Sequence, residues 1–283
     1  MIKIAIQKSG RLYDDSIQLL KECGLSIDNG KGQLKAKVRN FPAEILYLRN
    51  SDIPYYVQNG VADLAIIGQN VVYEKQADII ELLELGFSKC RISIAVPKTT
   101  SYDSIQDLNG KKIATSYPLT LENFLSDNGV KADIHIINGS VEIAPSIGLS
   151  DAICDIVSSG STLFKNNLQE QEIIQRSQAS LYANKSSLSK YKSLIDQLSF
   201  RMSSVIRARN FNYILFNIPN ESIQTASAIL PGLKSPTIVP LLEEGWSSLH
   251  SVIDNSQTWN IIEELKQVGA QGILISEVSK MVI

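Results

Sequence analysis

Residues 153–162 have the sequence ICDIVSSGST, and this stretch decides the type of fold. The apolar, partly β-branched residues before Ser158 favour a buried strand, and Asp155 places a carboxylate near the end of that strand. The turn that follows consists of Ser158, Ser159, Gly160, Ser161 and Thr162. Hydroxyl residues are common N-terminal caps, so a helix is expected to begin near Thr162. A strand, a short turn and a helix in succession form the repeating unit of an α/β fold.

The hydroxyl-rich turn at 158–162 also has the composition of a phosphate-binding turn. Hydroxyls and backbone N–H groups can converge on one phosphate, and Gly160 allows a close approach of the backbone. The helix N-terminus adds a partial positive charge, typically worth about 0.3–1 kcal/mol. Asp151 and Asp155 lie just upstream, where carboxylates could accept hydrogen bonds from ribose hydroxyls, so the pattern favours a sugar phosphate. The alternative is an ordinary strand-to-helix loop whose hydroxyls only cap the helix.

The composition is that of a folded protein without a nucleic-acid or membrane partner. The 283 residues suggest two or three domains, and 44% hydrophobic and 20% charged residues are ordinary values. A net charge of −2 argues against nucleic-acid binding. No apolar run approaches the roughly 20 residues that span a bilayer. The first residues, MIKIAI, lead into a polar turn without the apolar core of a signal peptide, so we expect a cytoplasmic protein.

The cysteines and histidines give no sign of a metal site or a disulfide. Three widely spaced cysteines and two histidines form no zinc-binding pattern. We expect Cys90 and Cys154 to be packing residues, because no histidine lies nearby in the sequence to activate either thiol. The sequence contains neither G-x-x-x-x-G-K-[ST] nor G-x-G-x-x-G, which excludes an ordinary P-loop NTPase and a Rossmann dehydrogenase.

Short apolar runs alternate with helical patterns before residue 209, which indicates an α/β architecture with mostly parallel strands. The predicted strands are residues 2–6, 44–49, 63–67, 92–96, 112–115, 134–137 and 152–157. The predicted helices are residues 14–23, 52–60, 120–127, the one near Thr162, and a single long helix over 188–207. The last part predicts strands at 213–218, 237–241, 249–253 and 272–275, with helices at 221–229 and 258–268. That βαββαβ order is typical of a ferredoxin-like module.

Six stretches, in sequence order over essentially the whole chain, resemble the ATP phosphoribosyltransferase family in its long form. They are QKSGRL at 7–12, DIP at 52–54 with Gly60 and Asp63, CR at 90–91, ATSYP at 114–118, the run from Asn138 to Leu163, and LPGLKSPTI at 230–238. The resemblance implies an α/β fold: a two-lobed catalytic core like a type II periplasmic binding protein, plus a C-terminal ferredoxin-like α+β regulatory domain. The implied boundaries are 1–96 with 175–209 for lobe I, 97–174 for lobe II, and 210–283 for the C-terminal domain.

The family's reaction, as the resemblance implies it, is attack of adenine N1 of ATP on the anomeric carbon of phosphoribosyl pyrophosphate (PRPP). Pyrophosphate leaves, the configuration inverts, and N1-(5-phosphoribosyl)-ATP forms as the first step of histidine biosynthesis. N1 carries its own lone pair, so no protein nucleophile is required. Mg²⁺ is the implied cofactor, held mainly by the substrate pyrophosphate rather than by a dedicated protein site.

The resemblance also assigns residues to the two substrates. It places the 5-phosphate of PRPP on the 158–162 turn and the ribose and reacting centre near Glu142, Asp151 and Asp155. The residues assigned to ATP and the polyphosphates are Lys8, Arg11, Arg49, Arg91 and Tyr117. Lys8 and Arg11 follow a predicted strand, a ligand-facing position in open α/β sheets. Arg49 and Arg91 could equally be surface or ion-pair residues, and Tyr117 could equally be a packing aromatic.

The C-terminal module of the long form binds histidine, the feedback inhibitor, in a homo-oligomer that ranges from dimer to hexamer. The matching positions are Asn217, Leu233, Thr237 and Gly272. Asn217 stands where some relatives carry an aspartate, and a neutral amide offers a hydrogen bond without charge attraction. AMP is a further candidate ligand. Composition alone would also fit a plain packing or oligomerisation domain.

Two other functions fit parts of the pattern. A non-catalytic binding protein of the two-lobed type would show similar strands but has no need of a ribose-phosphate turn. A phosphoribosyltransferase for another base would keep that turn. The run at 8–12 and the C-terminal module favour the ATP-dependent family over this second alternative.

Overall fold

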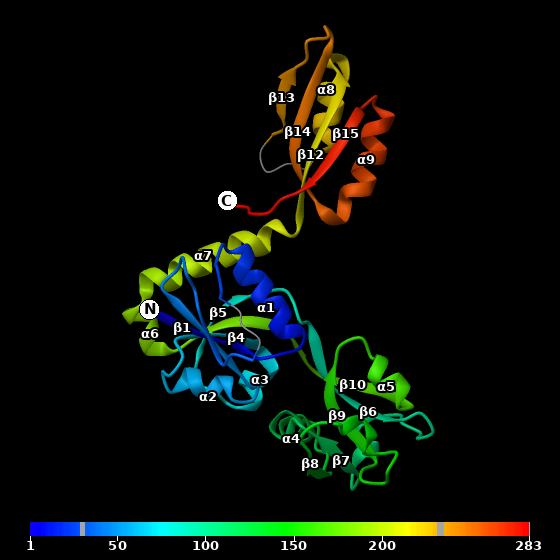
Figure 1. Ribbon diagram of the computed structural model, residues 1–283. Helices are drawn as coiled ribbons and strands as arrows, with labels where there is room; N and C mark the ends of the chain where they lie inside the picture. The colour runs from blue at the N-terminus through cyan, green and yellow to red at the C-terminus, as the bar shows by residue number, and fades with distance from the viewer. Residues whose placement is uncertain (29–31, 231–234, 283) are drawn as a thin grey trace. The chain divides into compact units, whose positions relative to one another are not determined.

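The computed structural model describes residues 1–28, 32–230 and 235–282, which form two compact units (Figure 1). The first unit is Met1–Asp196 and the second is Gln197–Ile283. The first unit contains two sheets, and the second contains one. In the described ranges, no helix combines the length and the apolar composition needed to cross a membrane.

The first sheet is six-stranded, with a fully buried centre. Its order is β2 (Lys35–Lys37), β3 (Ala43–Leu48), β1 (Ile2–Gln7), β4 (Leu64–Gly68), β11 (Ala179–Ala183) and β5 (Ile80–Glu84). The helices that alternate with its strands are α1 (Arg11–Glu22), α2 (Ile53–Gln58) and α3 (Gln69–Glu74). Ile4, Ile45 and Ile66 lie on three neighbouring strands and are fully buried, as expected for central strands covered on both faces.

The second sheet is five-stranded and has an apolar cluster on each face. Its order is β10 (Leu168–Ser177), β6 (Cys90–Pro97), β9 (Ala152–Val157), β7 (Lys112–Thr115) and β8 (Asp133–Ile136). Its helices are η1 (Ile105–Leu108), α4 (Pro118–Asp127), η2 (Val141–Ile143) and α5 (Ser161–Lys165). Because strand side chains alternate, Ile92 and Ile94 pack with Leu121 of α4, while Ala95 and its neighbours pack with Leu163 of α5.

Both sheets are mixed, so the prediction of mostly parallel strands is wrong. β1 runs parallel to β3 and β4, and β7 runs parallel to β8 and β9. β6 runs antiparallel to β9 and β10, and β11 runs antiparallel to β4 and β5. The chain enters the second sheet at β6 and leaves it through β10 towards β11. Of these connecting strands, β6 runs antiparallel to its neighbour β9 and β11 runs antiparallel to its neighbour β4, and both β4 and β9 belong to strand–helix units.

Three local expectations also differ from the structure. The predicted long helix over 188–207 is two helices, α6 (Lys185–Lys190) and α7 (Lys192–Ala208), because Tyr191 leaves helical geometry at φ −121° and ψ 27°. The sequence places residues 92–96 in the first lobe, but β6 pairs in the second sheet. Strands β2, β5, β10 and β11 and helix α3 are not among the predicted elements: β5 has glutamates at 81 and 84, on no strand period, and β11 consists largely of small residues.

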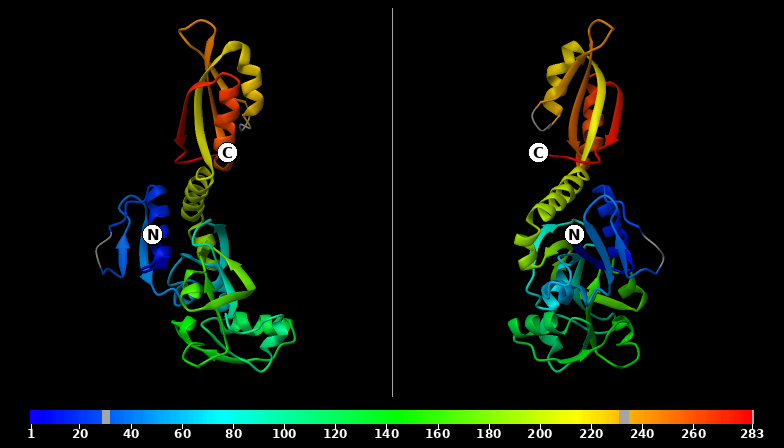
Figure 2. Two further views of the ribbon diagram at one scale, coloured as in Figure 1. Left: turned by 90° about the vertical axis from the view of Figure 1, so that its right-hand side faces the viewer. Right: turned by 60° about the vertical axis from the view of Figure 1, so that its left-hand side comes forward.

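The second unit contains the ferredoxin-like module that the sequence predicts. Its elements are β12 (Phe211–Pro219), η3 (Asn220–Ser222), α8 (Ile223–Ile229), β13 (Thr237–Pro240), β14 (Trp246–Asp254), η4 (Asn255–Gln257), α9 (Thr258–Gln267) and β15 (Gln271–Glu277). The antiparallel sheet has the order β13-β14-β12-β15. Helices α8 and α9 cover one face of it (Figures 1 and 2), where Phe216 and Leu265 are fully buried. The layout of the fold is therefore confirmed: a two-lobed α/β core and a ferredoxin-like α+β module.

Candidate active site

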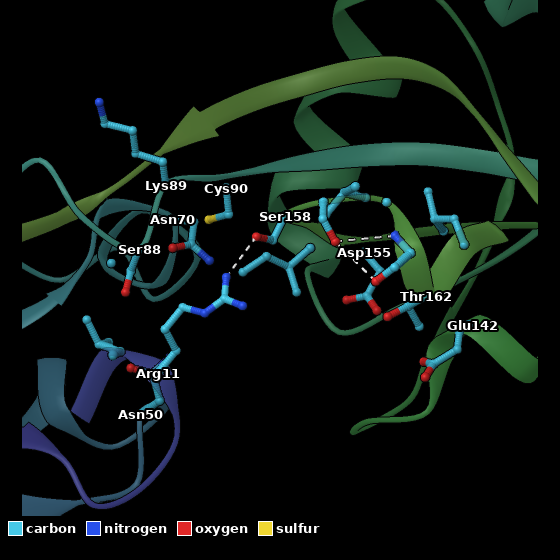
Figure 3. Close-up of a pocket in the computed structure, with 18 of the residues that line it drawn as sticks. Arg11, Asn50, Asn70, Ser88, Lys89, Cys90, Glu142, Asp155, Ser158 and Thr162 are labelled. Atoms are coloured by element: carbon cyan, nitrogen blue, oxygen red, sulfur yellow. Dashed lines mark hydrogen bonds between the residues drawn. The ribbon is translucent and has the colours of Figure 1, made fainter. Parts of the chain in front are cut away.

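A cavity of about 480 Å³ lies between the loops of the two sheets of the first unit (Figure 3). Its walls come from the turn after β1, the start of α3, the segment before β6, η2, and the turn between β9 and α5. The polar and charged residues that line it are Gln7, Arg11, Asn50, Asn70, Ser88, Lys89, Glu142, Asp155, Ser158, Ser159, Ser161 and Thr162. The structure therefore brings the predicted turn together with two of the three predicted carboxylates.

The 158–162 turn owes its shape to Gly160. This residue has φ +79° and ψ 0°, in the left-handed region that glycine adopts without strain, and it is the N-cap of α5. The Ser159 hydroxyl accepts a hydrogen bond from the Ser161 N–H at 3.4 Å and donates one to the Ser161 hydroxyl at 3.1 Å. Because N–H groups in a first helical turn have no intrahelical partner, such a turn suits an oxyanion.

Arg11 reaches this turn from the other lobe. It is the first residue of α1, directly after Gly10, whose φ is +90°. Its Nη1 donates to the Ser158 hydroxyl oxygen at 3.3 Å, as Figure 3 shows. One guanidinium from the first sheet therefore faces the hydroxyl-rich turn of the second across the cavity.

Asp155 and Glu142 place two carboxylates beside the turn. Asp155 is half-buried on β9, and burial raises its pKa to about 6; the nearby Glu142 carboxylate also raises it, against a backbone hydrogen bond from Ile156 that lowers it. A carboxylate in such a place can accept hydrogen bonds from sugar hydroxyls and offset a positive charge on a bound molecule.

Arg91 does not line the cavity, and the ion-pair alternative holds for it. Its Nε and Nη2 bond the two carboxylate oxygens of Glu170, each at 2.5 Å. Its Nη1 donates to the Ser158 carbonyl oxygen at 3.0 Å. The Arg91 guanidinium therefore bonds the backbone of the turn and does not present a free cation to the cavity.

The structure does not bring Asp151 to this cavity, contrary to expectation. Asp151 precedes β9, whereas Asp155 lies four residues further along the extended strand, which separates them by about 13 Å. The Asp151 carboxylate accepts a hydrogen bond from the Lys112 N–H at 2.8 Å and lines a different pocket, of about 720 Å³. Adjacency in the sequence was misleading because the two carboxylates lie towards opposite ends of one strand.

Lys8, Arg49 and Tyr117 lie around the cavity rather than in its lining. β1 and β3 are parallel with Gln7 opposite Leu48, so the exposed Lys8 and Arg49 follow at the same edge of the sheet. Tyr117 lines a neighbouring pocket of about 330 Å³ that shares Asn50 with the main cavity. The Tyr117 hydroxyl accepts a hydrogen bond from Asn70 at 3.3 Å, and burial raises its pKa.

The polar lining residues that the sequence did not single out are Asn50, Asn70, Ser88 and Lys89. Asn70 is buried at the start of α3, where it contacts both Ser177 and Tyr117. Gly68 makes room for it, because a Cβ at Gly68 would lie 2.4 Å from the Asn70 side-chain oxygen. The available signal was position: Gly68 ends the parallel strand β4, and ligands in open α/β sheets bind beyond such ends.

Cys90 and Cys154 are not activated thiols. Burial raises the pKa of Cys154 to about 12 and also raises that of Cys90, which lines the cavity. Among the residues that the structure describes, no group of three or more His, Cys, Asp or Glu side chains could hold a metal ion. Asp155 and Glu142 are the carboxylates at the cavity, enough for a cation held mainly by substrate oxygens.

Two of the four positions expected for histidine share one face of the C-terminal sheet. Asn217 pairs with Ser248 of β14, and Thr237 pairs with His250, two residues further along β14. Side chains alternate along a strand, so Asn217, Thr237, Ser248 and His250 all lie on the sheet face opposite the helices. Gly272 lies beside Asn217, whose side-chain nitrogen is 3.7 Å from where a Cβ at Gly272 would stand. Leu233 lies outside the described residues.

A two-lobed α/β core whose shared cavity combines a hydroxyl-rich turn, two carboxylates and a guanidinium suits a ligand that carries both a phosphate and sugar hydroxyls. Comparison with known proteins identifies the family. The family model described as ATP phosphoribosyltransferase matches residues 49–204, and the family model of the HisG C-terminal domain matches residues 208–280. The chain belongs to the ATP phosphoribosyltransferase family.

Individual relatives agree over the full length. An ATP phosphoribosyltransferase of Cytophaga hutchinsonii is 52% identical over 282 residues, covering 100% of this chain and 99% of the relative. One of Bacteroides fragilis is 48% identical over 283 residues, covering 100% of both. A chain of the ATP phosphoribosyl transferase (HisG:HisZ) complex from Thermotoga maritima is 29% identical with a TM-score of 0.62, covering 72% of this chain and 99% of that one. The protein is thus an enzyme, a pentosyltransferase of the first step of histidine biosynthesis.

Proposed function

We propose that this cavity binds PRPP and ATP together and that adenine N1 displaces pyrophosphate from the anomeric carbon with inversion. The observation that carries the proposal is the meeting of the 158–162 turn with Asp155 on one side and Arg11 on the other. The turn binds the 5-phosphate through hydroxyls and backbone N–H groups. Asp155, three residues before the turn, then lies at the height of the ribose.

The two carboxylates act on the sugar. Asp155 and Glu142 accept hydrogen bonds from the ribose hydroxyls and offset the positive charge that develops as the bond to pyrophosphate breaks. Holding N1 in line with the anomeric carbon supplies much of the remaining acceleration, since effective molarities correspond to about 7–11 kcal/mol. The thiol of Cys90 stays protonated because burial raises its pKa, so it takes no part as a nucleophile.

The cations of the first lobe bind the polyphosphates. Arg11 already reaches the cavity, and Lys8 and Arg49 lie at adjacent strand ends of the same sheet. Tyr117 borders the neighbouring pocket, a suitable place for part of the nucleotide. Mg²⁺ would neutralise the leaving pyrophosphate, with Asp155 and Glu142 as the protein oxygens available to hold it. Both substrates are cytoplasmic metabolites, so we place the enzyme in the cytoplasm.

The lobes are best divided where the chain passes between sheets. The boundaries 1–96 with 175–209, 97–174 and 210–283 then shift slightly, because β6 begins at Cys90 and β10 ends at Ser177 in the second sheet. We also propose that the C-terminal module binds histidine on the sheet face that carries Asn217 and Thr237, in a dimer-to-hexamer assembly, with AMP as a further candidate ligand.

An absorbance assay tests the reaction directly. Purified protein with ATP, PRPP and Mg²⁺, and with pyrophosphatase to remove the product pyrophosphate, should form phosphoribosyl-ATP. Asp155→Asn should lower turnover far more than it lowers ATP affinity. Folded wild-type protein that makes no product would contradict the proposal, and equal losses of turnover and ATP affinity would contradict the role of Asp155.

Truncation tests the proposed regulation. A chain that ends after Arg209 keeps α7 and both sheets of the core but loses the ferredoxin-like module. We expect it to make phosphoribosyl-ATP without inhibition by histidine, while the full chain is inhibited. Unchanged inhibition in an active truncated protein would place the histidine site elsewhere.

A further inference from the structure

Glu170 lies near the cavity without lining it, and its carboxylate accepts three side-chain hydrogen bonds. Its two oxygens accept the Nε and Nη2 donors of Arg91, and the Ser93 hydroxyl donates to the same carboxylate at 2.6 Å. Both side chains of the ion pair are only 24% exposed. The bonds from Arg91 are the main cause that lowers the pKa of Glu170, so the carboxylate stays ionised.

The pairing of the strands explains how Glu170 comes to hold Arg91. Side chains alternate along β6, so Arg91 and Ser93 share a face, and Glu170 of β10 pairs opposite Ala95 on that same face. The Arg91 side chain therefore runs along its own strand, past Ser93, to reach the carboxylate. Ser93 pairs on its other side with Asp155, which places the ion pair next to the site carboxylate.

Arg91 passes this constraint on to the 158–162 turn. With two N–H groups bonded to Glu170, its Nη1 donates to the Ser158 carbonyl oxygen at 3.0 Å. The peptide group is planar and trans, so fixing that oxygen also fixes the direction of the Ser159 N–H, which points the opposite way. Ser158 and Ser159 line the cavity but Arg91 does not, so the guanidinium holds the turn from behind.

Packing of α5 gives the turn little further support. Helix α5 is five residues long, and Leu163 is its buried residue. A short helix contributes few packing contacts, so the backbone direction at Ser158 depends on polar bonds.

We infer that Glu170 is a positioning residue for the phosphate turn: it holds Arg91 in one rotamer, and Arg91 orients the peptide between Ser158 and Ser159 for PRPP. This inference rests on the proposed assignment of the turn to the 5-phosphate of PRPP. Glu170 itself touches no substrate. Its effect should therefore fall on PRPP binding and leave ATP binding, which does not use this turn in the proposed arrangement, unchanged.

The test compares Glu170→Gln with a matched control on the same strand, Glu172→Gln. The carboxylate of Glu172 is also half-buried, but it accepts a hydrogen bond from the Tyr102 hydroxyl at 2.9 Å, away from Arg91. We expect Glu170→Gln to raise the KM and the Kd for PRPP about tenfold, because hydrogen bonds between charged groups are lost. The KM for ATP should stay within about twofold in both variants, and Glu172→Gln should bind PRPP as the wild type does.

A double-mutant cycle separates action through Arg91 from a general structural effect. Arg91→Lys keeps the charge but loses the paired donors, and it should raise the KM for PRPP by a similar factor. The double variant should be no worse than either single variant, because both break one chain of contacts. Additive effects, or an unchanged KM for PRPP in Glu170→Gln, would overturn the inference.

The same experiments distinguish this inference from the proposed function. An inactive, folded wild type contradicts the function, whereas an active wild type with an unaffected Glu170→Gln contradicts only the positioning role. Thermal unfolding of each variant shows whether it folds. Should Glu170→Gln fail to fold, Glu170→Asp retains the charge with a shorter reach, and the same rise in the KM for PRPP is expected; a wild-type KM would overturn the inference.

Discussion

The turns at 7–12 and 158–162 have the same local construction and opposite chemistry. Each follows a strand of a parallel pair, β1 or β9, and each leads into a helix through a glycine with positive φ at the N-cap. Gly10 has φ +90° and Gly160 has φ +79°. The first turn presents Lys8 and Arg11, whereas the second presents hydroxyls beside an acid.

The difference teaches how the two halves divide the work. The basic turn leads into a 12-residue helix with Ile17, Leu19 and Leu20 buried, so its backbone is anchored by packing. The hydroxyl turn leads into a five-residue helix and is held by Arg91 and its ion pair instead. The anchored turn presents an exposed cation, while the turn that must present backbone N–H groups is fixed by directional bonds.

The largest effect should come from Asp155, the carboxylate just before the hydroxyl turn. Asp155→Asn should lower turnover by about 10²–10³-fold, the usual loss when one group that stabilises transition-state charge is removed. Steady-state rates with varied ATP and PRPP measure this. The matched variant is Asp151→Asn, whose carboxylate bonds the Lys112 backbone in another pocket, and it should retain most of its turnover. Equal losses of turnover in the two variants would show that Asp151 also belongs to the active site.

A smaller effect should separate the cation of one turn from the hydroxyl of the other. Arg11→Ala removes a charged donor, so we expect a loss of about 1.5–3 kcal/mol in substrate binding. Ser158→Ala removes the neutral partner of the same 3.3 Å bond and should cost only about 0.5–1.5 kcal/mol. Isothermal titration with PRPP measures both. A larger loss of PRPP binding for Ser158→Ala than for Arg11→Ala would contradict the proposal that the basic turn recognises the charge of the substrate.

The sequence predicted the local parts of this comparison well. β7 and β9 match the predicted strands residue for residue, because each is a short apolar run bounded by polar or turn residues. The phosphate turn was likewise visible, since its hydroxyls and glycine are consecutive. The ferredoxin-like module was recognised from the order of its elements alone.

What the sequence could not supply was direction and distance. A strand pattern carries no sign of whether its neighbour is parallel, so β6 was predicted as a strand but its antiparallel direction was missed. Asp151 and Asp155 seemed equivalent because they are close in sequence, although an extended strand separates them. Arg91 was expected to face the substrates, and the partner that redirects it, Glu170, is 79 residues away. Contacts of that range arise from the sheet topology.

The glycines of the two turns should differ in what they tolerate. Gly10 combines φ +90° with ψ −179°, a region occupied essentially by glycine, whereas Gly160 is in the left-handed helical region that asparagine also adopts. Gly10→Asn should therefore lower the free energy of unfolding by about 1–3 kcal/mol. Gly160→Asn should lower it by less than about 1 kcal/mol. Urea unfolding measures both, and equal losses would mean that the two turns are not distinguished by backbone strain.

The smallest effect is a dependence of stability on pH that should appear only on the acidic side. Folding raises the pKa of Asp155 to about 6, so the folded state binds this proton more tightly than the unfolded state, where the pKa is about 3.9. Stability due to this group is therefore present at low pH and is lost as the pH rises through about 6.

Asparagine carries no charge, so Asp155→Asn should be more stable than the wild type at pH 8 by about 1–2 kcal/mol, after allowance for partial exposure, and the difference should vanish near pH 4. Arg11→Ala, at an exposed cation, should show no such dependence on pH. A stability difference for Asp155→Asn that is constant from pH 4 to 8 would mean that burial does not destabilise the ionised Asp155 carboxylate.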